Sequence, residues 1–191
     1  MPWEKQFDEE EVLDKAMAAF WRHGFKGTSM KCLVQETGLN PGSIYAAFHD
    51  KRSLFERCLD RYKAKTEAKW AGLAAGRSPR DAILGLFDMM NAEACEAGGG
   101  QGCMLINASL EGDDDPEIAE AVRTGMRGAE DFIRSQIEAG QAAGEIPADR
   151  DPAETARLIL GVLTGARVIV RCDTGHPFVA ESRAFAEHLL T

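Results

Sequence analysis

The sequence lacks the features that mark membrane, secreted and disulfide-stabilised proteins. No uncharged apolar run is long enough to span a bilayer, and the N-terminal residues MPWEKQFDEEE soon turn acidic, unlike a secretory leader. The five cysteines are odd in number and show no C-x-x-C or Cys/His ligand spacing, which argues against a disulfide framework and a zinc site. We therefore expect a soluble, cytoplasmic protein with reduced thiols, no membrane partner and no bound metal.

Signatures of catalysis are also missing. The chain has no nucleophile elbow, no phosphate-binding glycine loop and no paired carboxylates outside the acidic turn at 113–115. The four histidines are scattered along the chain and do not define a catalytic triad. We expect no catalytic residue and no cofactor, and we keep an enzyme on a helical scaffold as an alternative that turnover of a substrate would reveal.

Strands are not indicated, because apolar residues recur at helical spacing and nowhere alternate. The sequence predicts an all-α protein of about nine helices, with an N-terminal three-helix unit and a larger C-terminal helical body. The expected helical segments are 8–23, two short helices within 28–51, then 51–73, 80–95, 102–110, 117–143, 153–171 and 178–190. Glycines 98–100 are expected to interrupt the chain between two of them.

Residues 28–51 have the spacing of a helix-turn-helix. Gly38 suits the left-handed end of the first short helix, and Asn40 suits the N-cap of the second. Ile44 and Phe48 share one face of that second helix by the i, i+4 rule, so they are expected in the core. The other faces are then free to enter a DNA major groove.

Charge is distributed unevenly along the chain. The net charge of −9 argues against nucleic-acid binding, but residues 22–69 carry +5 and the remainder carries −14. This asymmetry predicts a basic DNA-binding head on an acidic body. A solvated helical surface can give a similar count.

The stretch from Thr28 to Phe55, which includes E-T-G-L-N-P-G-S-I-Y-A-A-F-H-D-K-R-S-L-F, resembles the TetR family of bacterial repressors. The resemblance covers the first third of the chain, and the rest fits by length and helical pattern. It implies a DNA-binding domain at 1–50, here called the head. Residues 51–191, here called the body, would supply a linker helix plus an effector-binding and dimerisation domain. The boundary between the two packing units is expected inside the fourth helix, near 62–70.

Several head residues are candidates for DNA contact. The best-placed donors are Lys31, Tyr45, His49, Lys51 and Arg52, and phosphate contacts would supply much of the affinity. The resemblance implies that Tyr45 and Lys51 touch phosphate and that small residues lie against base edges. Tyr45 packing between helices is the alternative. The full predicted surface is Thr28, Ser29, Lys31, Pro41, Gly42, Ser43, Tyr45, Ala46, His49, Lys51 and Arg52.

The resemblance also implies a homodimer. TetR-like proteins pair their last two long helices in a four-helix bundle, and Ala153–Val170 with Phe178–Leu190 fit that role. Two heads about 34–36 Å apart would meet successive major grooves of a pseudo-palindromic double-stranded operator.

The body is expected to hold a small-molecule effector. Methionine and aromatic residues line adaptable pockets, although each of them can equally be ordinary core. Asn107 needs a hydrogen-bond partner within an apolar segment, and either a ligand or a neighbouring helix end would serve. The predicted pocket is Phe87, Met90, Cys103, Met104, Asn107, Met126 and Phe132.

Cys103 is the strongest candidate for a reactive residue in that pocket. It follows G-G-G-Q-G at an expected helix N-terminus, where the helix dipole favours a thiolate. The run G-C-M-L-I-N resembles a segment of the NemR-like branch of the family, some members of which sense electrophiles or oxidants through a cysteine. The alternative is a small buried hydrophobe.

Together these features predict a repressor that an effector releases from DNA by population shift. An effector bound in the body would favour a head separation that no longer matches the operator. A regulator controlled by a protein partner, without a small-molecule pocket, is the alternative, and a filled body core would favour it.

Overall fold

The structure is a computed structural model that describes residues 7–95, 100–111 and 115–191. These residues form nine helices and no strand, as predicted. The helices are α1 (Glu9–Gly27), α2 (Met30–Thr37), α3 (Pro41–Phe48), α4 (Lys51–Ala74), α5 (Pro79–Cys95), α6 (Met104–Glu111), α7 (Pro116–Ala142), α8 (Pro152–Cys172) and α9 (Pro177–Leu189). The predicted break at 98–100 lies mostly outside the described residues. Among those residues, no helix is both long and apolar enough to cross a bilayer.

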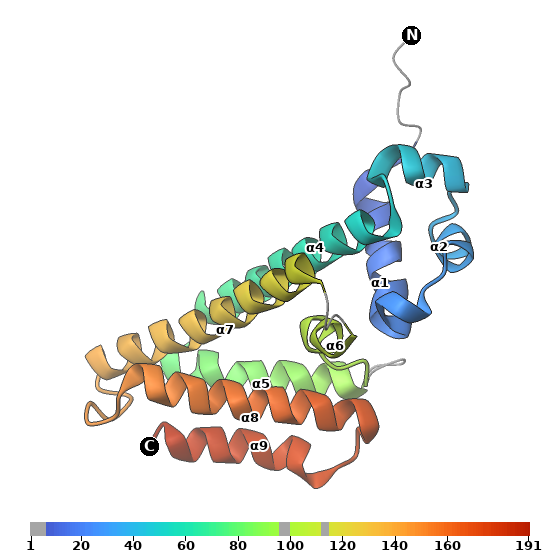
Figure 1. The fold of residues 1–191 in the computed structure, drawn as a ribbon. Helices are drawn as coiled ribbons and strands as arrows, with labels where there is room; N and C mark the ends of the chain where they lie inside the picture. The colour runs from blue at the N-terminus through green and yellow to red at the C-terminus, as the bar shows by residue number, and fades with distance from the viewer. Residues whose placement is uncertain (1–6, 96–99, 112–114) are drawn as a thin grey trace.

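The head forms through local capping. Ser29 caps α2 by accepting a hydrogen bond from the Cys32 N–H, and Asn40 caps α3 by accepting one from the Ser43 N–H at 2.9 Å. α2 ends at Gly38, as predicted. The short helices α2 and α3 therefore sit at one end of the molecule, next to α1 (Figure 1).

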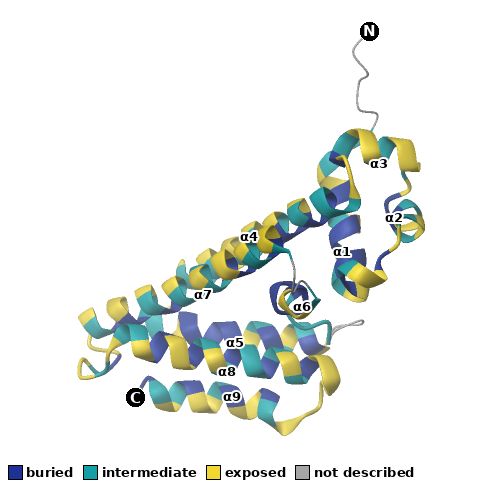
Figure 2. Ribbon diagram, in the orientation of Figure 1, coloured by how far each residue is buried: buried dark blue, intermediate teal, exposed yellow. Residues whose placement is uncertain are grey.

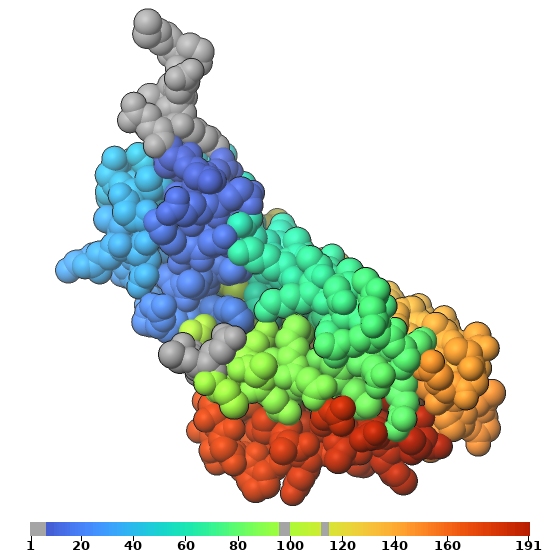
Figure 3. Space-filling view, turned by 180° about the vertical axis from the view of Figure 1, so that it is seen from behind, coloured from blue at the N-terminus to red at the C-terminus, as the bar shows by residue number. Residues whose placement is uncertain are grey.

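The long helix α4 leads away from the head, and α7 runs beside it (Figure 1). Helices α5, α8 and α9 pack below them, while the short α6 lies between the head and this layer. From behind, the α4–α5 surface lies between the head and the α8–α9 base (Figure 3). The head is therefore at the opposite end of the molecule from α9.

Two hydrophobic cores share the interior, and their buried side chains are visible as dark segments in Figure 2. The first joins α1, α2, α3 and the start of α4 to α6 and the start of α7. The second joins α5, α8, α9 and the later part of α7. Tyr62 belongs to the first core, whereas Trp70 and Leu73 pack against the second. We propose that the boundary between the head and body packing units falls within α4, between Tyr62 and Trp70.

α1 continues beyond the predicted end at residue 23. Gly24 has φ 74°, which kinks the helix, and the chain resumes helical form to Gly27. A Cβ at Gly24 would overlap the carboxylate of Glu111, which also accepts a hydrogen bond from the Lys26 N–H at 3.1 Å. The kink therefore lets the end of α6 dock against the head.

Candidate DNA-binding surface and effector site

α3 presents one exposed face. Ile44 and Phe48 are at most 1% exposed and anchor the helix in the first core, as predicted. On the other side, Tyr45 is 48% exposed, so it does not pack between helices. The predicted contacts Pro41, Gly42, Ala46 and His49 are also exposed, and Ser43 is half-buried. This face has the small side chains that let a helix approach base edges closely.

A two-residue turn joins α3 to α4. His49 has φ 65° and ψ −57°, and the Asp50 N–H donates to the Phe48 carbonyl at 2.8 Å, which makes a γ-turn. The Asp50 carboxylate then caps α4 by accepting from the Ser53 N–H at 2.7 Å. The same hydrogen bond lowers the pKa of Asp50. The turn holds the His49 side chain, which is exposed, at the end of α3.

Two residues of the predicted DNA surface close the gap between α1 and α2. Thr28 is fully buried, and its hydroxyl donates to the Gly24 carbonyl at 2.6 Å. The Ser29 side chain is exposed but serves as the N-cap of α2. The Thr28 side chain therefore does not reach the surface, since its hydroxyl binds a backbone carbonyl in the last turn of α1.

The cations at the start of α4 have partners within the protein. The Lys51 ammonium donates to the carbonyls of Phe25 and Thr28 at 2.9 and 3.0 Å and lies 4.3 Å from the Phe25 ring centroid. The Arg52 guanidinium pairs with Asp115 at 2.8 Å. It also pairs with two glutamates, Glu117 at 2.8 Å and Glu56 at 3.1 Å. Lys51 thus holds α4 against the end of α1, and Arg52 holds α4 against the start of α7.

The carboxylates around Arg52 perturb one another. Burial and a hydrogen bond with Glu117 raise the pKa of Glu56. Burial acts to raise the pKa of Asp115, but hydrogen bonds from the Ile118 and Glu117 backbone and the Arg52 charge lower it below its ordinary value. Asp115 therefore stays ionised and keeps the pairing with Arg52.

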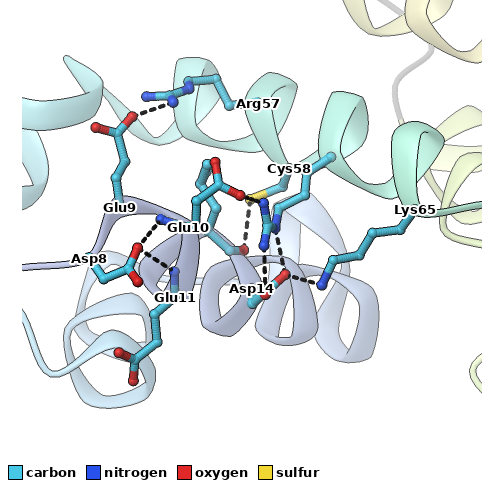
Figure 4. A network of polar contacts seen from close by, with 10 residues as sticks. Asp8, Glu9, Glu10, Glu11, Asp14, Arg57, Cys58 and Lys65 are labelled. Atoms are coloured by element: carbon cyan, nitrogen blue, oxygen red, sulfur yellow. Dashed lines mark hydrogen bonds and ion pairs between the residues drawn. The ribbon is translucent and has the colours of Figure 1, made fainter. Parts of the chain in front are cut away.

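Acids of α1 neutralise much of the basic charge further along α4 (Figure 4). Arg57 pairs with Glu9, and Arg61 pairs with both Glu10 and Asp14. Asp14 also pairs with Lys65 at 2.5 Å. Residues 22–69 carry a net charge of +5, but residues 8–69, which include the acids of α1, carry only +1. Among the described residues, Lys31 on α2 is an exposed cation with no ion pair, so it is available to phosphate.

A cavity opens in the body between α4, α5, α7 and α8, with α6 along one side. The cavity itself has a volume of about 60 Å³, and the space free of atoms reaches about 620 Å³ when its open mouth is included. The aromatic and polar side chains of the wall come mainly from α4, and the apolar ones mainly from α5, α7 and α8. The lining residues are Tyr62, Lys63, Thr66, Glu67, Trp70, Leu86, Met89, Cys103, Leu105, Ile106, Gly125, Met126, Ala129, Leu160, Leu163, Thr164 and Arg167.

Cys103 lies half-buried at the N-terminal end of α6 and lines this cavity. The Tyr62 hydroxyl donates to its Sγ at 3.5 Å. Gly102, with φ 69°, lets the loop pass close to α8, because a Cβ there would lie 3.0 Å from the Arg167 carbonyl. The Asn107 side chain donates to the Gln101 carbonyl at 2.9 Å. The partner of Asn107 is therefore the loop that carries Cys103.

A partly buried ion pair lies near the thiol, on the same side of the cavity. Arg167 exposes only 13% of its side chain and pairs with Glu93 at 3.2 Å, and Glu93 also pairs with Lys69 at 2.7 Å. Burial acts to raise the pKa of Glu93, but hydrogen bonds and charge from Lys69 and Arg167 outweigh it and lower that pKa. Burial raises the pKa of Tyr62, so its hydroxyl stays protonated as a donor. The wall near Cys103 therefore offers a cation and a hydroxyl donor to an oxygen-bearing ligand.

The predicted pocket residues do not all meet here. Cys103 and Met126 line the cavity. Phe87, Met90 and Met104 are at most 1% exposed and belong to the two cores. Phe132 stacks on Trp70, with ring centroids 5.6 Å apart, behind the lining. Residue type marked the methionine and aromatic residues as candidates, but it does not distinguish a core position from a cavity wall.

Sequence reasoning missed two kinds of residue. Tyr62 and Arg167 were not predicted, although an arginine within the apolar run LILGVLTGARVIV was a visible signal of a buried polar site.

His23, Cys32 and Glu36 were not grouped either. Their ligand atoms lie within 4.8 Å of one another between α1 and α2. The i, i+4 spacing of Cys32 and Glu36 was the only hint.

A helix-turn-helix head joined to an all-α body that holds a cavity defines a DNA-binding regulator. Comparison with known proteins agrees. Residues 12–58 match the family of bacterial regulatory proteins called the tetR family, and residues 81–181 match the tetracyclin repressor-like C-terminal domain. The chain is 30% identical over 172 residues to the HTH-type transcriptional repressor ComR of Escherichia coli K12, covering 87% of this chain and 81% of ComR. The chain belongs to the TetR family of DNA-binding transcriptional regulators.

Solved structures agree over nearly the whole chain. A cysteine mutant of the TetR family regulator CifR, complexed with 26bp double-strand operator DNA, is 26% identical with a TM-score of 0.82, covering 98% of this chain and 97% of that one. The reduced form of E. coli NemR has a TM-score of 0.88 at 19% identity, covering 95% and 96% of the two chains, and supports the fold. TetR regulators bind operator DNA as dimers, so double-stranded DNA and a second copy are the partners of this chain.

Proposed function

We propose that this chain is a dimeric repressor that leaves its operator when an electrophile adds to Cys103 in the body cavity. The observation that carries this proposal is the position of the Cys103 Sγ, which lines the cavity and accepts a hydrogen bond from Tyr62. An α,β-unsaturated carbonyl is the class of compound that fits. Arg167 and Tyr62 supply the cation and donor that its oxygen needs.

The chemistry is a conjugate addition. The Cys103 thiolate attacks the β-carbon, a carbon–sulfur bond forms, and the π electrons of the double bond move toward the carbonyl oxygen. The proton lost from the thiol is returned to the α-carbon, so no oxidant and no leaving group are required. Tyr62 and the neighbouring guanidinium of Arg167 stabilise the negative charge that develops on oxygen.

Modification of Cys103 has two structural routes to the head. Tyr62, which bonds to the thiol, packs edge-on against Trp21 of α1 with ring centroids 5.2 Å apart. The helix that begins after Cys103 ends at Glu111, whose carboxylate binds the Lys26 N–H. An adduct that displaces Tyr62 or shifts α6 thus acts on α1 and favours head positions that do not match the operator.

The dimer surface is supported by exposed apolar residues on α8 and α9. Leu158 and Val168 of α8 are 52% and 42% exposed, and Phe185 of α9 is 50% exposed. Exposed large apolar side chains on two neighbouring helices favour burial against a second copy. This supports pairing through Ala153–Val170 and Phe178–Leu190.

The open body favours a small-molecule effector over control by a protein partner alone. A regulator controlled by a protein partner needs no cavity in its core, whereas this body has a cavity between α4 and α8. A reversible ligand without covalent chemistry is the second candidate, and the apolar wall formed by Leu86, Leu160 and Leu163 supports it.

The test is operator release by N-ethylmaleimide, followed by fluorescence anisotropy of labelled operator DNA. We expect the wild-type protein to lose operator affinity upon modification and Cys103→Ser to keep it. The double variant Cys95→Ser/Cys172→Ser is the matched control, because both thiols are exposed and lie outside the cavity. It should respond like the wild type. Release of the Cys103→Ser protein at the wild-type dose would remove the covalent proposal and leave the reversible ligand.

A further inference from the structure

A second cluster of reactive side chains lies in the head, remote from the cavity. His23 projects from the last turns of α1, and Cys32 and Glu36 come from successive turns of α2. One ring nitrogen, the Sγ and one carboxylate oxygen all lie within 4.8 Å of one another. Three different helix turns therefore bring three donors of different chemistry to one point.

The donor set indicates the class of cation. Thiolate, imidazole and carboxylate are the three protein ligands of Zn²⁺, whereas Mg²⁺ and Ca²⁺ prefer oxygen alone. With metal–ligand distances of about 2.0–2.3 Å, tetrahedral ligands lie roughly 3.3–3.8 Å apart. The donors here therefore need at most about 1.5 Å of further approach. His23 and Glu36 are exposed, so their side chains are free to rotate that far.

A neighbouring residue already orients one donor. Arg22 pairs with the Oε1 of Glu36 at 3.2 Å, which engages one carboxylate oxygen and holds the side chain toward α1. Hydrogen bonding of a ligating carboxylate is a common feature of metal sites. Cys32 is half-buried between the same helices and has the least freedom of the three.

We propose that His23, Cys32 and Glu36 bind one borderline divalent transition-metal ion of the Zn²⁺ class. The ion fastens α1 to α2, with water completing its coordination. On binding, the Cys32 thiol releases one proton to solvent and a metal–sulfur bond forms, so no redox partner takes part. The bound ion holds the helix that precedes the DNA-reading helix α3, independently of the cavity and of Cys103.

Cobalt(II) is the spectroscopic probe for this site. Untagged, full-length, reduced protein freed of metal by chelation is titrated with Co²⁺, and the near-ultraviolet thiolate-to-cobalt charge-transfer band is recorded. We expect one Co²⁺ per chain, a band that Zn²⁺ abolishes, and binding that weakens as the pH falls because protons compete for the thiolate and imidazole. Excess Zn²⁺ should also raise the thermal midpoint, because it binds the folded state.

Substitutions assign the band to the cluster. Cys32→Ser should remove it, and His23→Gln should weaken Co²⁺ binding by about tenfold or more. Because His23 is exposed, the second variant leaves the core intact and tests the site even if Cys32→Ser folds poorly. Cys172→Ser, at an exposed thiol on α8, is the control and should bind as the wild type does. Absence of the band in the wild type, or a band unchanged in His23→Gln, would overturn the proposal.

Discussion

At the scale of single residues, the charged side chains of the head serve two purposes. Lys51 and Arg52, at the start of α4 next to the head, are engaged within the protein: backbone carbonyls accept from Lys51, and carboxylates at the surface pair with Arg52. Lys31 is exposed on α2 and makes no ion pair with the described residues. Formal charge along the sequence therefore overstates the charge that DNA meets, because it counts both kinds alike.

This difference predicts that one lysine substitution changes operator binding and the other changes stability. Lys31→Met should weaken operator binding and reduce the slope of log affinity against log salt by about 0.9 for each lost phosphate contact, or about 1.8 for a dimer. Lys51→Met should leave that slope unchanged and lower the free energy of unfolding by about 1.5–3 kcal/mol, since it removes charge-assisted hydrogen bonds.

Anisotropy titrations at several salt concentrations and denaturant unfolding measure the two quantities. The variants serve as controls for each other, because each should change the quantity that the other preserves. A lower salt slope in Lys51→Met would show that its ammonium leaves the two carbonyls to bind phosphate.

At the scale of elements, the sequence was sufficient where the signal is local. Gly38 and Asn40 predicted helix ends because a cap acts on its own turn. Contacts between elements carry no such signal. At the Gly24 kink the chain meets Glu111, which is far along the sequence, so no local pattern could predict that contact.

The candidate site shows the same limit. Cys103 was predicted from its neighbours in sequence, whereas its environment comes from Tyr62 of α4 and Arg167 of α8. Residue type made Phe87 and Met126 equal candidates for the pocket, and only packing separates the core from the cavity. The sequence could therefore predict only those features of the site that depend on residues within one helix or loop.

The Glu93 ion pairs, which join α4, α5 and α8, make a pH-dependent contribution to stability. Because the folded-state pKa of Glu93 lies below its ordinary value of 4.5, its contribution is present above that value and is lost as the pH falls toward the lowered pKa. Glu93→Gln should be less stable than the wild type near neutral pH, and this difference should shrink below about pH 4.5.

Urea unfolding across the acid range tests this expectation. Glu145→Gln is the control, since Glu145 is exposed in the turn between α7 and α8, outside the proposed dimer surface, and its replacement should leave stability unchanged across this range. A difference between Glu93→Gln and the wild type that stays constant with pH would show that Glu93 is not ionised against Arg167 and Lys69.

At the scale of the whole molecule, DNA recognition depends on two heads held at a fixed separation. The exposed Leu158 and Phe185 lie on α8 and α9, the layer farthest from α3 (Figure 1). The proposed dimer interface would therefore set the head separation from the opposite end of the molecule. An effector that shifts α4 or α6 would change the helices that connect the head to the α8–α9 layer.

Charging this interface should separate the protomers. Leu158→Glu/Phe185→Glu should sediment as a monomer and lose operator affinity by about a hundredfold or more, because the second head no longer binds intramolecularly. Leu110→Glu, on α6 and 71% exposed, should remain dimeric in the same sedimentation velocity experiment. A dimeric double variant would place the interface elsewhere.

Footprinting on the DNA beside its own gene tests the central claim most directly, which is that two copies of α3 read successive major grooves. The account predicts protection of two symmetric half-sites about 10 base pairs apart or a multiple of that, and loss of protection when Ala46→Glu places a carboxylate on the exposed face of α3. Failure to protect any duplex at low salt, or protection that survives Ala46→Glu unchanged, would contradict it.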